Sequence, residues 1–143
     1  MMYYHHYYHN PLFFTVVLAS LCAFIQIFLT IQVIRLRWRF KTAVGAIKKE
    51  IYERRNGALS NFNSFAPIFL ILFALAEYNR VNCGLLFFLG GLFIAGRLYH
   101  IYSVYTHETR TKSYKLRMFG MISTFLVLIA LALANLYIAL AYI

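Results

Sequence analysis

The residues best suited to chemistry are cations and amides gathered where four apolar stretches of the sequence end. An arginine presents a planar fork of donors that matches a carboxylate, so several arginines at one place favour an anionic ligand. An arginine beside a thiol also favours the thiolate at neutral pH. A tripeptide with two carboxylates and a thiol would fit such a cluster. The cluster comprises Arg35, Arg37, Arg39, Arg54, Arg55, Asn61, Asn63, Ser64, Arg97, Tyr99, His100, Tyr102 and Arg117.

The same arginines have a second interpretation, which is contact with lipid. A basic side chain near an anionic membrane surface contributes roughly 1 kcal/mol to membrane binding. Taken one at a time, most arginines of the cluster are explained by contact with lipid headgroups. Arg97 and Arg117 adjoin apolar stretches directly, so a ligand explains these two as well as a headgroup does. Both interpretations remain open from the residues alone.

Several other kinds of chemistry are excluded or disfavoured. The sequence contains no HExxH, CxxC, GxSxG or glycine-rich phosphate loop. His5, His6 and His9 match no standard metal spacing, so no metal site is predicted. Cys22 and Cys83 are expected at different membrane depths, which disfavours a disulfide. No acidic residue lies inside an apolar stretch, which disfavours a proton-coupled transporter.

The elements that must position the cluster are membrane spans. Of 143 residues, 62% are apolar, and only 14 basic and 4 acidic residues carry charge, a composition that argues against a soluble enzyme and against disorder. A net charge of +10 does not indicate nucleic-acid binding, because the charge lies between apolar stretches rather than on a soluble face.

A helix needs about 20 apolar residues to cross a bilayer. Of the four apolar stretches, the second and third are shorter than this, so they span a bilayer only if the helix continues through the polar flanks at 60–65 and 96–105. The four stretches are Leu12–Ile34, Phe62–Ala76, Val81–Ala95 and Met118–Ile143.

The polar segments between the stretches differ in charge. Residues 35–55 hold eight basic residues and residues 97–117 hold five, whereas residues 77–82 hold one. By the positive-inside rule, the two basic segments are predicted to be cytoplasmic loops, with both termini on the non-cytoplasmic side, in the inner membrane if the protein is bacterial. Residues 1–11 lack the features of a signal peptide and are expected to form a short tail. Residues 12–143 are expected to form one domain with four transmembrane helices.

Helical spacing predicts which polar groups face the interior. Positions three or four apart share a helix face, which places Asn61 with Ser64 and Arg97 with His100. Polar groups at membrane depth are tolerated when they face protein, so Asn61 and Arg97 are predicted to point inward. Pro67 removes one backbone hydrogen bond near these groups and frees a carbonyl.

Glycines are frequent in the third stretch, at positions 84, 90, 91 and 96. Small residues let the backbones of membrane helices approach closely. The third helix is therefore expected to pack closely against its neighbours.

Four segments of the chain resemble the MAPEG family, the membrane-associated proteins in eicosanoid and glutathione metabolism, and especially its small bacterial members. The resemblance extends over roughly residues 30–140 in order and spacing. It implies an all-α, left-handed bundle of four transmembrane helices, assembled as a homotrimer. The segments are IQVIRLRWRF (31–40), ERRNGALSNFNSFAPIFLILFALAE (53–77), GRLYHIY (96–102) and KLRMFGMISTF (115–125).

The resemblance also implies a function. Enzymes of the family bind glutathione between subunits near the cytoplasmic face and form its thiolate, which adds to lipophilic electrophiles or reduces lipid hydroperoxides. Carried over to this chain, Arg117 would stabilise the thiolate. Arg37 would contact a glutathione carboxylate, Asn61 the glutathione backbone, and His100 would replace a tyrosine ligand. The full set expected to bind glutathione is Arg37, Arg54, Asn61, Ser64, Arg97 and His100.

Two departures from the family pattern leave a rival function open. Ser64 stands where the family has a glutamate for the glutathione amine, with Phe65 beside it in place of a tyrosine, and Gly57 stands where an arginine is expected. A lost charge-assisted hydrogen bond costs roughly 1.5–3 kcal/mol. The rival is a non-catalytic lipid-binding or scaffold protein with a degenerate glutathione site. A small transporter is a third alternative.

Overall fold

The structure, a computed structural model, describes residues 12–39, 46–107 and 115–141. This part of the chain contains four α-helices, one π-helical turn and no strand. A π-helical turn is rare and often lies at a functional position. In chain order the elements are α1 (Phe13–Arg39), α2 (Ala46–Tyr78), α3 (Cys83–Tyr102), η2 (Ser103–His107), which is the π-helical turn, and α5 (Lys115–Ala141).

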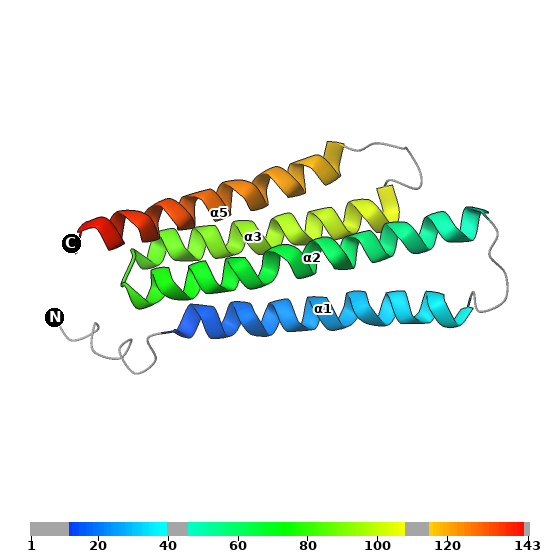
Figure 1. The fold of residues 1–143 in the computed structure, drawn as a ribbon, viewed down its shortest axis with the longest axis horizontal. Helices are drawn as coiled ribbons and strands as arrows, with labels where there is room; N and C mark the ends of the chain where they lie inside the picture. The colour runs from blue at the N-terminus through cyan, green and yellow to red at the C-terminus, as the bar shows by residue number, and fades with distance from the viewer. Residues whose placement is uncertain (1–11, 40–45, 108–114, 142–143) are drawn as a thin grey trace.

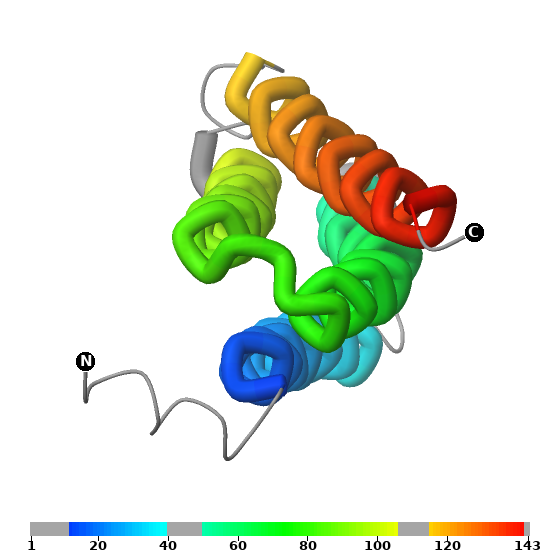
Figure 2. The backbone as a smooth tube through the Cα atoms, turned by 90° about the vertical axis from the view of Figure 1, so that its left-hand side faces the viewer, coloured from blue at the N-terminus to red at the C-terminus, as the bar shows by residue number. Residues whose placement is uncertain are grey.

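The four α-helices lie side by side along the long axis of the molecule, and each runs against the previous one (Figure 1). Viewed along the bundle, α1 lies beside α2, and α3 lies beside α5 (Figure 2). The start of α1 and the end of α2 meet at one end, here called the Glu77 end. The end of α3 and the start of α5 meet at the other, here called the Arg97 end. The predicted four-helix bundle is confirmed.

The helices are long and apolar enough to cross a membrane, and their outer surfaces are apolar as well. The candidate spans run over Phe13–Arg39, Glu50–Tyr78, Cys83–Tyr105 and Lys115–Ala141. Large apolar side chains such as Phe24 on α1 and Leu126 on α5 remain exposed, as expected of a surface that faces hydrocarbon. The predicted helical extension through residues 60–65 and 96–105 is confirmed.

The predicted basic loops are a partial error, because most of the described residues in them are helical. Residues 35–39 belong to α1, α2 begins at Ala46, and α3 continues through residues 97–102. Arginine and lysine are good helix formers, and their long side chains extend from a helix toward water. A change from apolar to basic composition therefore does not mark the end of a helix in this chain.

A short turn joins α2 to α3 at the Glu77 end. The N–H of Val81 donates to the carbonyl of Ala76, and the N–H of Arg80 donates to that of Glu77. This pair of bonds is the Schellman pattern that ends many helices. Arg80 adopts the left-handed conformation that the pattern requires, with φ of 59°. Asn82 then caps α3, because its side-chain oxygen accepts from the N–H groups of Gly84 and Leu85.

Glu77 also fixes the start of α1. One carboxylate oxygen accepts from the N–H of Phe14 at 2.7 Å. The other accepts from the N–H of Thr15 at 2.7 Å and from its hydroxyl at 2.6 Å. The carboxylate thus supplies acceptors for N–H groups that have no partner within the first turn of a helix.

The core is aromatic in its middle and glycine-rich where α3 meets α5. The ring of Phe69 on α2 stacks on that of Phe93 on α3, with centroids 3.7 Å apart. A Cβ added to Gly96 would lie 2.2 Å from the Ser123 hydroxyl, so the predicted close packing of α3 is confirmed there. It does not extend to Gly91, where an added Cβ would meet nothing within 4 Å.

Candidate functional site

Arg97 is the centre of a polar cluster inside the bundle. Its side chain is 1% exposed. One terminal nitrogen, Nη1, donates to the Oδ1 atom of Asn61 on α2 at 2.6 Å. The other, Nη2, donates to the Gly120 carbonyl on α5 at 3.1 Å and to the Thr124 hydroxyl. A single side chain of α3 therefore binds α2 and α5, and the prediction that Asn61 and Arg97 point inward is confirmed.

Glycines make this contact between α3 and α5 possible. A Cβ added to Gly120 would lie 2.7 Å from the carbonyl oxygen of Gly96, a distance that real Cβ atoms do not show. The hydroxyls of Ser123 and Thr124 both donate to the Gly120 carbonyl at 3.0 Å. That carbonyl accepts from Arg97 as well, so it is the meeting point of the cluster.

Neutral groups surround the guanidinium of Arg97. Its carbon lies 5.7 Å from the ring centre of Phe65 and 5.8 Å from that of Phe93. Aromatic faces attract cations through their quadrupole. Asn61 is itself oriented by a contact from its Nδ2 to the sulfur of Met121 at 3.2 Å. Among the described residues, no carboxylate forms an ion pair with Arg97, so its charge is stabilised by dipoles and rings alone.

The segment from Arg97 to Tyr105 carries an unusual number of buried polar atoms without a partner. Within the described part of the chain these atoms are Arg97 Nε, His100 Nε2, Ser103 Oγ and the Tyr105 hydroxyl. Each such atom costs roughly 1–3 kcal/mol, and most proteins keep few of them. His100 follows Arg97 by three residues on α3 and is 3% exposed. The cluster therefore combines the buried charge of Arg97 with donors and acceptors that have no partner among the described residues.

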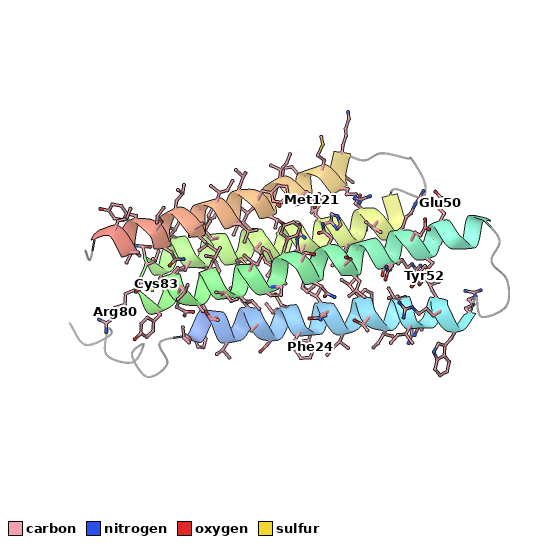
Figure 3. The ribbon with its side chains drawn as sticks, viewed as in Figure 1. Phe24, Glu50, Tyr52, Arg80, Cys83 and Met121 are labelled. Carbon is pink, nitrogen blue, oxygen red and sulfur yellow. The ribbon has the colours of Figure 1, made fainter. Side chains whose placement is uncertain are left out.

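Other arginines lie farther along the bundle, beyond the buried cluster. Arg37 at the end of α1 donates to the hydroxyl of Tyr52 at 3.0 Å, and Arg54 pairs with Glu50 on the same helix. Glu50 and Tyr52 mark the first turns of α2 at the Arg97 end, opposite Arg80 and Cys83 (Figure 3). Arg55 binds Gln32 on α1 at 3.2 Å, and its guanidinium lies over the ring of Tyr105.

The chain matches the family model of the MAPEG family over residues 15–137. The chain belongs to the MAPEG family. No curated protein matches it. Family membership, with the four candidate spans, makes this an integral multi-pass membrane protein of the glutathione and eicosanoid metabolism type, at the level of the family.

The predicted site residues of this MAPEG protein fall into two groups. Asn61 and Arg97 are hydrogen-bonded, and His100 is buried three residues after Arg97, whereas Arg117 is exposed at the start of α5. Arg37 and Arg54 lie beyond this cluster on the exposed part of the bundle, and Ser64 lies on the outside of α2. The Ser64 hydroxyl donates to the Ser60 carbonyl of its own helix at 3.0 Å. Three of the seven predicted residues, Asn61, Arg97 and His100, thus lie together inside the bundle of a single chain.

The sequence interpretation missed Gly120, Met121 and Thr124. All three lie on the helix face that begins at Arg117, because they follow it by three, four and seven residues. That spacing was a usable signal. It was not recognised because glycine, methionine and threonine are common in the apolar stretches of membrane helices.

The thiols and the potential metal ligands are not part of the cluster. Cys22 is buried on α1, Cys83 is exposed at the start of α3, and both are free. Within the described residues, no group of three His, Cys, Asp or Glu side chains could hold a metal ion. The N-terminal histidines lie outside the described residues.

Proposed function

We propose that this MAPEG protein is a glutathione-dependent transferase or peroxidase that acts on lipophilic electrophiles or lipid hydroperoxides. The observation that carries the proposal is the buried positive charge at the Arg97 end, which has no carboxylate partner among the described residues. A buried cation without a counter-ion favours an anionic ligand. Glutathione supplies carboxylates and, when deprotonated, a thiolate.

Arg117 is the proposed catalytic residue. It is exposed at the start of α5, three residues before Gly120, whose carbonyl accepts from Arg97. A cation beside the thiol stabilises the thiolate, which is the reactive form. The thiolate then forms a carbon–sulfur bond with an electrophile, while the leaving group or the adjacent carbon takes up a proton. With a hydroperoxide, two glutathione molecules supply two electrons and yield an alcohol, water and glutathione disulfide.

The remaining predicted residues bind the ligand in this proposal. Asn61 and His100 offer polar atoms to glutathione, and Arg97 contributes its charge and orients Asn61. Arg37 and Arg54 would take the carboxylates from the exposed part of the bundle. Ser64 offers a neutral acceptor. The membrane concentrates the lipophilic partner beside them, and the Arg97 end would face the cytoplasm, with both termini on the other side.

A homotrimer would complete this site. Arg37, Arg54 and Ser64 lie outside the buried cluster of their own chain, so a second copy is the means to bring equivalent residues to it. Independent support comes from a pocket of about 240 Å³ between α1 and α2, lined in part by the exposed amides of Gln26 and Asn63. Amides that face hydrocarbon are costly, and a neighbouring chain would satisfy them.

The rival is a non-catalytic lipid-binding or scaffold protein of the same fold. The observation that favours it is the exposed surface of α2, where Ser64 bonds to its own helix and an added side chain at Gly57 would meet nothing. Positions 57 and 64, where the family resemblance leads one to expect an arginine and a glutamate, therefore carry no charge in this chain.

Titration of the purified protein with glutathione, followed by thiolate absorbance, separates the two functions. The enzyme predicts a thiolate signal at neutral pH, and the scaffold predicts none. In a conjugation assay, Arg117→Ala should shift the pH profile to higher pH, because the thiol loses its cation. Arg117→Lys should retain part of the effect, and Arg35→Ala serves as the control. An unshifted profile with normal turnover in Arg117→Ala would remove Arg117 from the mechanism.

A further inference from the structure

An apolar groove, here called the α1–α3 groove, runs between α1 and α3 and opens to the outer surface of the bundle. These two helices pack mainly against other neighbours, α1 against α2 and α3 against α5 (Figure 2). The space between them has a volume of about 360 Å³, and the described residues that line it are all apolar or glycine. Large exposed side chains form its two walls, Val17 and Leu21 on α1 and Phe87 and Leu98 on α3.

Two consecutive glycines of α3 shape the α1–α3 groove. Gly90 lies at its floor, where an added Cβ would be 2.9 Å from a Cδ atom of Leu18 and 3.4 Å from the ring of Phe73. Gly91 is exposed, and an added Cβ there would meet nothing within 4 Å. Ala95, one turn farther along α3, is also small and exposed. The groove therefore has a closed floor and open space above it.

The size of the α1–α3 groove fits one hydrocarbon chain better than a helix. Its lining extends from Leu86 to Leu98 on α3, about 18 Å, and from Phe14 to Leu21 on α1, about 10 Å. Over these lengths, a volume of 360 Å³ gives a mean cross-section of about 20–35 Å². A helix is about 10–12 Å across with its side chains, so it needs about 80 Å² or more. A helix of a second copy would rest on the walls and leave the groove unfilled.

The α1–α3 groove lies at membrane depth and on another face of α3 from the polar cluster. Its lining residues belong to the candidate spans Phe13–Arg39, Glu50–Tyr78 and Cys83–Tyr105, so its open side faces hydrocarbon. Arg97 donates to residues of α2 and α5, whereas the groove lies between α3 and α1. Apolar cavities do not hold water. A groove that faces hydrocarbon and lacks polar groups suits a lipid of the bilayer better than a substrate that reacts at the cluster.

We propose that the α1–α3 groove binds one acyl chain of a diacyl membrane lipid from the leaflet at the Glu77 end. The chain enters beside Phe14 and Leu86, which lie in the first turns of α1 and α3, and runs toward Leu98. Leu98 lies about 22 Å along α3 from Cys83, whereas half of the hydrocarbon core is about 15 Å thick. The groove therefore accommodates the whole length of a long chain.

The bound chain joins α1 to α3 along a line where they have little other contact. Lipid tails are as apolar as the lining residues, so the gain comes from van der Waals contact with the floor and both walls. The contact surface of a chain in the groove exceeds that of a chain on the convex surface of a helix. This inference does not depend on the proposed function, because it uses no residue of the glutathione site.

The test counts the lipids that stay bound to the protein. The full-length protein is released from dioleoylphosphatidylcholine nanodiscs in a native mass spectrometer, which gives the number of lipids and of protein copies. We expect one retained lipid per chain. Ala95→Phe places a ring in the groove and should lower the retained fraction by about ten-fold or more. Ala132→Phe adds the same ring to the exposed surface of α5 and should leave that fraction unchanged.

A second variant and the number of copies complete the test. Gly91→Leu fills the same groove from a position with open space, so it should fold and should also lose the lipid. Equal retention in the groove variants and in Ala132→Phe would overturn the inference. The absence of a retained lipid from the wild-type protein would mean that something else fills the groove, with the same consequence. A fall in the number of protein copies in Ala95→Phe but not in Ala132→Phe would identify a second copy as the occupant and would also overturn it.

Discussion

The two ends of the bundle differ in the surroundings of their central charged side chains, Glu77 and Arg97. At the Glu77 end, the carboxylate of Glu77 accepts three hydrogen bonds from Phe14 and Thr15, at a helix start that carries partial positive charge. At the Arg97 end, the guanidinium of Arg97 is buried, donates hydrogen bonds to neutral acceptors and lies near aromatic rings. Hydrogen-bond donors compensate the charge of Glu77, whereas no carboxylate of the described residues compensates that of Arg97.

This difference separates a structural role from a functional one. The bonds of Glu77 account for its presence, because they hold the start of α1 against the end of α2. Among the described residues, four of the five buried polar atoms without a partner lie in the segment from Arg97 to Tyr105, and the fifth, Asn135 Oδ1, lies on α5 beside Leu72 of α2. Such atoms are costly, and a bound ligand or water is one way to satisfy them. The comparison therefore favours the Arg97 end for the proposed ligand and predicts none at the Glu77 end.

The largest expected effect comes from removing the uncompensated charge. Arg97→Leu should destabilise the protein by about 4 kcal/mol or more, because three hydrogen bonds to a charged group are lost and each contributes roughly 1.5–3 kcal/mol. Arg97→Lys keeps the charge without the planar fork of donors, so its loss of stability should be smaller. Unfolding of the purified protein in micelles measures both, with Arg35→Leu as an exposed control. Wild-type stability in Arg97→Leu would show that Arg97 is not needed to join α2, α3 and α5.

The next effect tests the close approach of α3 and α5 that positions Arg97. Gly120→Ala should cost about 1–3 kcal/mol, because the new methyl group would press on the backbone of Gly96. The matched control is Gly91→Ala, which meets open space and should be neutral or stabilising by up to about 1 kcal/mol. Equal stabilities of the two variants would contradict the glycine contact.

A smaller effect is expected at the compensated charge. Glu77→Gln removes the negative charge from the start of α1 and should cost about 1 kcal/mol. The loss should be local, so hydrogen exchange should speed up at the amides of Phe14 and Thr15. Glutathione binding should not change, because the proposed ligand site lies at the other end of the bundle. Glu53→Gln is the control. Weakened glutathione binding in Glu77→Gln would contradict the prediction that only the Arg97 end binds the ligand.

The smallest effect concerns a charge that is exposed although it lies at the Arg97 end. Glu50→Gln removes the partner of Arg54 on the same helix face. Exposed pairs of this spacing contribute about 0.3–0.5 kcal/mol, so stability should stay within that range of the wild type. If Glu50→Gln instead lowers the free energy of unfolding by well above 1 kcal/mol in thermal unfolding, an exposed charge at this end matters as much as a buried one. Burial would then not explain why Arg97 differs from the exposed charged residues near it.

The sequence by itself determined the number of spans, their approximate places and the inward direction of Asn61 and Arg97. These properties follow from local rules, because the length of an apolar stretch sets whether a helix can cross a bilayer, and the period of 3.6 residues sets which side chains share a face. The same rules did not show where the helices end, since arginine and lysine continue a helix as readily as apolar residues do.

Only the tertiary structure decided what each inward group contacts. The partners of Arg97 on α5, Gly120 and Thr124, follow from the register of α3 against α5, which the contact between Gly96 and Gly120 sets. The direction of Ser64, on the outside of α2, also depends on which neighbours cover that helix. Local periodicity places a side chain on a face, but its partner depends on the packing of two separate helices, and no spacing within one helix encodes that packing.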